Sequence, residues 1–158
     1  MAAGPHAAEG LITATEKLLA FEEIRAVKAR YCRFLDTKDW EGLAELFTID
    51  AVLDVREDTG LEPFIGRDLL IDQIRRAVIH AKSAHQVHTP EISFLRPDEA
   101  TVIWAMQDRV VWKEGQSPLQ GVKSITGFGH YHERYVRQDG RWQIASLTLT
   151  RLYVEMHR

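Results

Sequence analysis

The spacing of the apolar residues changes once along this chain, near residue 85, and this change restricts the folds open to it. Before residue 85 the apolar side chains recur every three to four positions, which is typical of amphipathic helices. After it they alternate with polar ones, which is typical of strands that bury one face. Helices followed by strands that are joined through short turns predict an α+β fold, in which helices cover one face of an antiparallel sheet.

Three helices are predicted in the first half, over residues 15–35, 40–47 and 67–81. Thr15 and Asp39 are of the residue types that cap helix N-termini, and they stand where the first two helices begin. A strand over residues 51–55 and a turn over residues 57–60 separate the second helix from the third.

Four runs with the strand pattern make up the second half, over residues 85–95, 101–113, 123–137 and 141–153. Asp139-Gly140, between the last two runs, is a strong signal for a tight hairpin. We expect a curved antiparallel sheet, shaped as a cone, with the long first helix against its concave side. Such a cone encloses a pocket, and pockets of this type are mostly apolar with a few polar groups.

Length and composition limit the class of protein. The 158 residues fit one domain, which we place at residues 15–158, after a flexible tail at residues 1–14 that is rich in small residues. The net charge is -3, so the chain lacks the excess of basic residues that is typical of a nucleic-acid binder. No apolar run approaches the roughly 18–20 residues that cross a bilayer, and the first residues do not read as a signal peptide. The lone Cys32 excludes an intrachain disulfide, so we expect a cytoplasmic protein.

One aspartate interrupts an otherwise apolar strand face. In the run over residues 101–113, the residues on one side are Val102, Trp104, Met106, Asp108, Val110 and Trp112. A carboxylate in such a row costs free energy unless a partner neutralises it. Asp108 could cap a loop or pair with Arg109. Alternatively, it could be the buried partner of a histidine or of another group that transfers protons.

His88 is the histidine that the strand pattern assigns to the pocket, because it falls on the same face as Ile92 and Phe94. It could be an ordinary core residue. It could also pair with Asp108, which would fix the tautomer of the imidazole and raise its basicity.

Three more polar residues, Tyr31, Asp36 and Arg151, each admit two interpretations. Tyr31 lies in the apolar stripe of the first helix, where a buried phenol needs a hydrogen-bond partner. Asp36 follows at the end of that helix, off the stripe, and could be a solvated turn residue or part of the pocket. Arg151 shares a strand face with Leu147 and Leu149, so it extends its charge to solvent or neutralises a buried carboxylate.

His130 and His132 raise the question of a metal, because they share a strand face and could supply two ligands. The residues that flank them do not match a cupin motif, and the helical first half does not match that all-β fold. We therefore expect no metal.

Several segments resemble one known family. Residues 31–40 read YCRFLDTKDW and are similar to the Tyr-x-x-x-Leu-Asp-x-Lys-x-Trp segment of bacterial bile-acid 7α-dehydratases. These enzymes belong to the SnoaL-like, nuclear transport factor 2-like family, and residues 36–40 also resemble scytalone dehydratase of that family. Three further motifs are similar to those of the bile-acid enzymes: His88-Thr89-Pro90-Glu91-Ile92, Asp108-Arg109 and Arg151-Leu152-Tyr153. The resemblance covers about residues 16–155.

The resemblance implies a cone-shaped SnoaL-like fold and a cofactor-independent dehydratase that removes water from a hydroxy-steroid or a similar polycyclic enone. It implies a catalytic set made of Tyr31, Asp36, His88, Asp108 and Arg151. Tyr31 would donate to an enolate oxygen, and His88, oriented by Asp108, would act as base or acid. Asp36 would assist proton transfer, and Arg151 would hold the carboxylates.

Two other functions stay open on the same fold. One is an isomerase or a polyketide cyclase that uses these groups without loss of water, and the other is a non-catalytic module that binds a small molecule. The expected partners are a small hydrophobic substrate and further copies of this chain, and neither a nucleic acid nor a membrane. The resemblance and an apolar outer sheet face, with Ile103, Ala105 and Val111, predict a homo-oligomer, a trimer.

Overall fold

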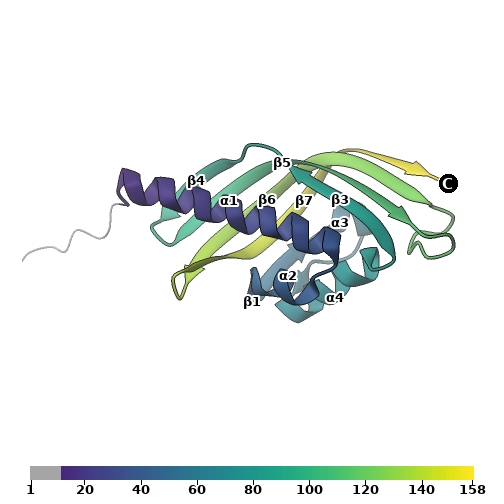
Figure 1. Cartoon of the computed structure of the whole chain (residues 1–158), viewed down its shortest axis with the longest axis horizontal. Helices are drawn as coiled ribbons and strands as arrows, with labels where there is room; N and C mark the ends of the chain where they lie inside the picture. The colour runs from purple at the N-terminus through teal and green to yellow at the C-terminus, as the bar shows by residue number, and fades with distance from the viewer. Residues whose placement is uncertain (1–11) are drawn as a thin grey trace, which may run out of the picture.

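The structure is a computed structural model that describes residues 12–158 (Figure 1). Its helices are α1 (Ala14–Thr37), α2 (Trp40–Glu45), α3 (Arg56–Thr59) and α4 (Arg67–Val78). Its strands are β1 (Phe47–Asp54), β2 (Phe64–Ile65), β3 (Ala81–Val87), β4 (Glu91–Arg96), β5 (Glu99–Trp112), β6 (Ser124–Gln138) and β7 (Arg141–His157). Most of the predicted tail, residues 1–14, lies outside the described residues. No helix within residues 12–158 is long and apolar enough to cross a membrane.

The strands form one curved sheet in the order β2–β1–β7–β6–β5–β3, and β4 also pairs with β5. All pairings among β3 to β7 are antiparallel, which confirms the α+β fold expected from the short turns. The β6–β7 hairpin turns at Asp139-Gly140, where both residues have positive φ, as the Asp-Gly signal predicts. One pairing differs from the prediction, because β1 lies parallel to β7 and makes the sheet mixed. Most of the chain separates these two strands, so no short turn forces them to run antiparallel.

The long helix α1 lies across one face of the sheet (Figure 1). Its apolar stripe is buried and consists of Ile24, Val27, Tyr31 and Leu35. The helix begins earlier than predicted, because Thr13 rather than Thr15 is its N-cap. Thr13 and Glu16 form a capping box, in which the side chain of each accepts a hydrogen bond from the backbone N–H of the other.

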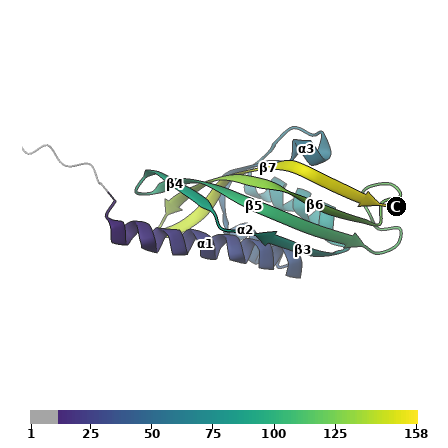
Figure 2. The same ribbon diagram turned by 90° about the horizontal axis from the view of Figure 1, so that it is seen from above.

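The short elements after α1 follow the prediction in outline. Asp39 caps α2 as predicted, and its side chain accepts a hydrogen bond from the backbone of Gly42. The predicted turn over residues 57–60 overlaps the single helical turn α3, which ends where Gly60 adopts a left-handed conformation. Figure 2 shows α3 close to β7. This contact brings the segment near the inner residues of the last strand.

The predicted strand over residues 85–95 is two strands, β3 and β4, which both pair with β5. Val87 lies opposite Met106, and Glu91 lies opposite Ile103, so residues 88–90 stand against only two residues of β5. One extra residue in a strand exchanges its inner and outer faces. In β3 the odd-numbered side chains therefore face inward, whereas in β4 the even-numbered ones do.

Candidate active site

A cavity of about 440 Å³ lies between α1, α4 and the inner face of the sheet. Most of its lining is apolar and includes Leu53, Ile74, Val110, Trp112, Leu147 and Leu149. The polar side chains within it include Tyr31, His85, Asp108, Tyr131 and Arg151. An apolar cavity with a few polar groups is the usual form of a small-molecule site.

His85 and Asp36 form a hydrogen-bonded pair at the wall of this cavity. Nδ1 of the His85 ring lies 2.7 Å from Oδ1 of Asp36, which stands in the last turn of α1. The backbone N–H of His85 donates to Oδ2 at 2.8 Å, and the Ser83 hydroxyl donates to Oδ1 at 2.8 Å. An ionised carboxylate only accepts hydrogen bonds, so Nδ1 carries the hydrogen and Nε2 of the neutral ring keeps a lone pair.

The hydrogen bonds keep Asp36 in its charged form. Burial acts to raise the pKa of Asp36, but the hydrogen bonds from His85 and Ser83 outweigh it and hold that pKa below its ordinary value. Within residues 12–158, Nε2 of His85 has no hydrogen-bond partner, and the residue lines the cavity. The ring can therefore exchange a proton with a bound molecule while Asp36 holds its far side.

Asp108 lies opposite His85 on the neighbouring strand β5, and its partner is Arg151. Nη1 and Nη2 of Arg151 donate to the two oxygens of Asp108 at 2.8 Å and 2.9 Å. Nε and Nη2 also donate to Asp58, just after the start of α3, at 2.9 Å and 2.8 Å. The Arg151 side chain is only 9% exposed. Burial acts to lower the pKa of Arg151, but Asp58 and Asp108 outweigh it and raise that pKa.

A glycine leaves the space that this ion pair occupies. Gly127 of β6 lies opposite Asp108 in the sheet. A Cβ at Gly127 would stand 2.8 Å from Nη1 of Arg151 and 3.1 Å from Oδ1 of Asp108. A larger residue here would force the end of the Arg151 side chain to shift.

Two buried tyrosines, Tyr31 and Tyr131, line the same cavity, and their ring centroids are 6.1 Å apart. Burial is the main cause that raises the pKa of both phenols, and the nearby charge of Asp108 adds to it. Both hydroxyls therefore stay protonated near neutral pH and can donate a hydrogen bond to a developing oxyanion.

A second buried ion pair lies behind these tyrosine rings. Nζ of Lys28 is 2.5 Å from Oε1 of Glu133, and both side chains are 0% exposed. The other carboxylate oxygen accepts hydrogen bonds from Nε1 of Trp104 at 2.8 Å and from the Tyr135 hydroxyl at 2.6 Å. Nζ also lies 4.0 Å and 3.7 Å from the centroids of the two cavity tyrosines. The ammonium group is thus held by one carboxylate and two ring faces.

The structure brings together four of the five predicted site residues: Tyr31, Asp36, Asp108 and Arg151. It does not bring His88 to them. The side chain of His88 is exposed, and its backbone N–H donates to the carbonyl of Ala105 at 2.9 Å. The predicted pairing of His88 with Asp108 is wrong, because the extra residue in 88–90 removes His88 from the inner face. The histidine in the cavity is His85.

Sequence reasoning missed His85, Lys28 and Glu133. Glu133 carries the same signal as Asp108, since it is the polar member of a buried alternating row with Tyr131 and Tyr135. Lys28 lies one helical turn from buried residues of the α1 stripe and could have been found in the same way. His85 would have followed from ending the strand before Pro90, because proline often marks a strand end or a bulge.

The histidine pair considered for a metal lies outside the cavity. The rings of His130 and His132 are 6.2 Å apart, and Nε2 of His132 lies 3.0 Å from the Thr150 hydroxyl. Within residues 12–158, no group of three or more histidine, cysteine, aspartate or glutamate residues is arranged to hold a metal ion. The expectation that the chain works without a metal stays a prediction.

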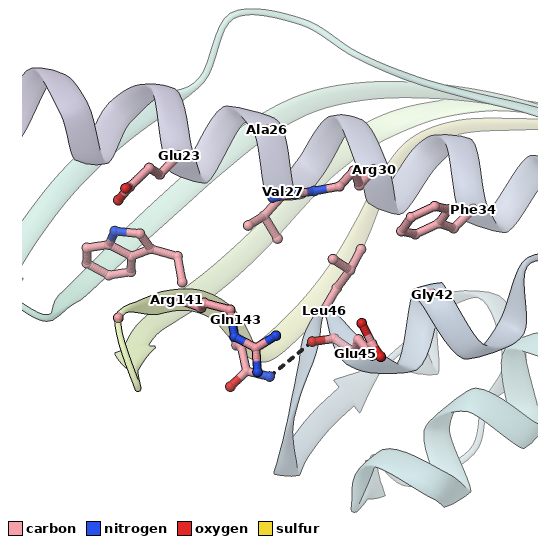
Figure 3. A pocket seen from close by; sticks show the side chains of 12 residues that line it. Glu23, Ala26, Val27, Arg30, Phe34, Gly42, Glu45, Leu46, Arg141 and Gln143 are labelled. Carbon is pink, nitrogen blue, oxygen red and sulfur yellow. Dashed lines mark hydrogen bonds between the residues drawn. The ribbon is translucent and has the colours of Figure 1, made fainter.

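A second hollow of about 380 Å³ lies against another face of α1 (Figure 3). Its ionisable lining residues are Glu23, Arg30, Glu45 and Arg141. The Gln143 side chain donates a hydrogen bond to the backbone carbonyl of Glu45 at 3.0 Å, and so connects β7 to the end of α2. The lining residues within the described chain include no histidine. We therefore place the candidate active site in the apolar cavity.

Comparison with known proteins agrees with this architecture. The profile of the SnoaL-like domain matches residues 16–148, so the chain belongs to the SnoaL-like family. This confirms the family that the sequence motifs indicated. A curated relative, probable cyclase FGR4 of Gibberella zeae, is 28% identical over 138 residues, which are 82% of this chain and 89% of that protein.

Solved structures share the fold at low sequence identity. The Kfla4162 protein of Kribbella flavida has a TM-score of 0.78 and 20% identity, and the match covers 88% of this chain and 95% of that one. Hexachlorocyclohexane dehydrochlorinase LinA-type3 of Novosphingobium barchaimii has a TM-score of 0.77 and 19% identity, with 92% and 94% covered. At these identities the likeness establishes the fold alone.

Proposed function

We propose that this chain is a cofactor-independent acid–base enzyme, a dehydratase that removes water from a hydroxylated polycyclic enone of the steroid type. The observation that carries the proposal is the His85–Asp36 pair, in which one ring nitrogen is held by the carboxylate and the histidine lines an apolar cavity. A buried carboxylate that holds one side of an imidazole is the arrangement used for proton transfer at carbon. Membership of the SnoaL-like family supports an enzymatic role.

The reaction needs a base, an oxyanion donor and an acid for the leaving group. In the proposed mechanism, Nε2 of His85 removes a proton from a carbon activated by the substrate carbonyl. The phenol of Tyr31 donates to the enolate oxygen as negative charge develops there. The electron pair of the broken C–H bond forms the new double bond, and the C–O bond breaks. The imidazolium returns the proton to the departing hydroxyl, so water leaves and His85 is neutral again.

The remaining polar groups support these steps. Asp36 stabilises the imidazolium that forms on His85. Arg151 pairs with Asp108, so Asp108 repels the enolate less than a free carboxylate would. The apolar walls lower the local dielectric around a bound substrate, which strengthens each electrostatic interaction there. The cavity of about 440 Å³ lies in the range of small-molecule sites and suits a fused-ring substrate more than a single sugar or amino acid.

A polyketide cyclase is the second candidate, and the curated relative named a probable cyclase favours it. The same base would form an enolate, which then attacks a second carbonyl of the same molecule instead of expelling a hydroxyl. Cyclisation by carbon–carbon bond formation alone leaves the mass of the substrate unchanged. Dehydration lowers it by one water.

The test is mass spectrometry of products from a panel of hydroxy-steroids and polycyclic hydroxyketones. We expect a product lighter by one water, with a loss of roughly 10²–10⁴-fold in kcat for His85→Gln. His88→Gln is the matched control, because His88 is exposed and outside the cavity. A product of unchanged mass would favour the cyclase. Full activity in His85→Gln would refute the proposed role of the pair.

A further inference from the structure

Lys38 occupies a backbone conformation that lysine rarely adopts. It follows α1 as its C-cap residue, with φ 66° and ψ 29°, in the left-handed region. Glycine and, to a lesser degree, asparagine take this conformation at little cost, whereas a lysine is strained there. Within residues 12–158, Asp139 is the only other non-glycine residue with positive φ. A strained residue that persists calls for a reason in its side chain.

The ammonium group of Lys38 reaches the candidate active site through one serine. Nζ donates to Oγ of Ser83 at 2.9 Å, and that hydroxyl donates to Oδ1 of Asp36 at 2.8 Å. Because an ammonium only donates, the Ser83 oxygen accepts from it, and its single hydrogen is directed to the carboxylate. Asp36 in turn holds the ring of His85. The four groups form one chain with a defined direction.

Capping of the helix does not explain the side chain. The backbone N–H of Lys38 already donates to the carbonyls of Leu35 and Phe34, and any residue would supply that N–H. Nζ adds a bond to the Leu35 carbonyl at 3.1 Å, but it lies in a half-buried position beside Asp36. Burial acts to lower the pKa of Lys38, and the charge of Asp36 opposes this. The ammonium is therefore held near the carboxylate, with Ser83 between them, at a cost in desolvation.

We propose that Lys38 is a positioning residue for the acid–base pair, acting through Ser83 to orient Asp36 and to keep it ionised. The effect on rate rests on the proposed function, whereas the effect on Asp36 does not. This positioning role explains why a strained lysine is present at the end of α1.

Other ionisable groups near Asp36 and His85 also influence the pKa of Asp36. Asp108 stands opposite His85 on β5 and pairs with Arg151, which also binds Asp58. Tyr31 lies five residues before Asp36 on α1 and stays neutral. Removing the ammonium from this set leaves Asp36 with less positive charge nearby. The pKa of Asp36 should therefore rise, since a nearby cation favours the ionised carboxylate.

The test compares Lys38→Gly with Lys38→Asn, Lys38→Arg and the control Asp139→Gly. Glycine and asparagine tolerate the left-handed backbone but lack the ammonium, and arginine keeps a cation. Asp139→Gly relieves the same kind of backbone strain in the distant β6–β7 turn. Thermal melts report the fold, and a ¹³C NMR titration of the Asp36 carboxyl reports its pKa without any substrate.

We expect Lys38→Gly and Lys38→Asn to be at least as stable as the parent chain, with a raised pKa of Asp36. With a turned-over substrate, kcat should fall about 10-fold while KM changes little, because one charge-assisted hydrogen bond in the network is lost. Lys38→Arg should recover part of the rate. Asp139→Gly should have the same pKa of Asp36 and the same kcat as the parent chain.

An Asp36 titration unchanged in both Lys38→Gly and Lys38→Asn would overturn the inference, as Lys38 would then be an end-cap residue only. A raised pKa of Asp36 in a protein that turns over nothing in the panel would support the positioning role and count against the proposed dehydratase. A raised pKa with an unchanged kcat would overturn the effect on rate.

Discussion

The buried Lys28–Glu133 pair gives the most direct quantitative prediction. Both side chains are fully withdrawn from water, and Nζ contacts only the carboxylate and two tyrosine faces among the described contacts. Lys28→Met keeps the length and apolar stem of the side chain but leaves Glu133 buried without its cation. Removing one partner of such a buried pair lowers the free energy of unfolding by about 3–5 kcal/mol.

The hydrogen bonds from Trp104 and Tyr135 to Glu133 remain in the variant and keep the loss within that range. For a chain of this size, the loss corresponds to a fall in Tm of roughly 6–20 °C. Lys28→Met with Glu133→Gln removes both charges while the glutamine oxygen still accepts from both donors. The double variant should recover most of the loss, since replacing a whole buried pair is often close to neutral.

Urea unfolding of the parent chain, both single variants and the double variant measures these differences and their coupling. Glu133→Gln should also destabilise, because it leaves the ammonium without its counter-charge. A loss below about 1 kcal/mol in Lys28→Met, far under the usual range for a broken buried pair, would refute the reasoning. So would a double variant less stable than either single one.

Three further predictions concern the site and the assembly. Gly127→Ala should displace Arg151 from the carboxylate opposite it, lower stability and reduce activity, and a crystal structure with the ion pair intact would contradict this. The lowered pKa of Asp36 means that its charged form contributes stability above the ordinary carboxyl range, a contribution lost as pH falls through the lowered value. Between about pH 6 and about pH 3, Tm should therefore fall less in Asp36→Asn than in the parent chain. Finally, the family resemblance together with the partly exposed Ile103 and Val111 on the outer sheet face predicts a trimer. Light scattering that gives a monomer mass at micromolar concentration would exclude it.

Local patterns in the sequence determined most of the fold. The 3.6-residue period predicts α1 and α4, and the alternation after residue 85 predicts the long strands β5, β6 and β7. The buried row of β5, with Asp108 as its polar member, follows from alternation alone. These features depend on neighbours a few residues apart, so the sequence carries them directly.

Family motifs extended this to the candidate site. They indicated five residues, of which the structure brings four together: Tyr31, Asp36, Asp108 and Arg151. They indicated that Arg151 holds the carboxylates, which the structure confirms for Asp108, but they assigned the wrong histidine. A polar residue in an apolar row requires a counter-group, but the row does not say which element supplies it. Asp108 was expected to hold a histidine and holds Arg151 of β7 instead.

Only the tertiary structure decided the pairings between distant segments. Asp36 meets His85, 49 positions away, because the end of α1 docks on β3. Lys28 meets Glu133, 105 positions away, because α1 crosses β6. The inner histidine is His85 because one extra residue at positions 88–90 exchanges the faces of the edge strand. Sheet register and helix docking are set by the packing of the whole core, so no local pattern of residues contains them.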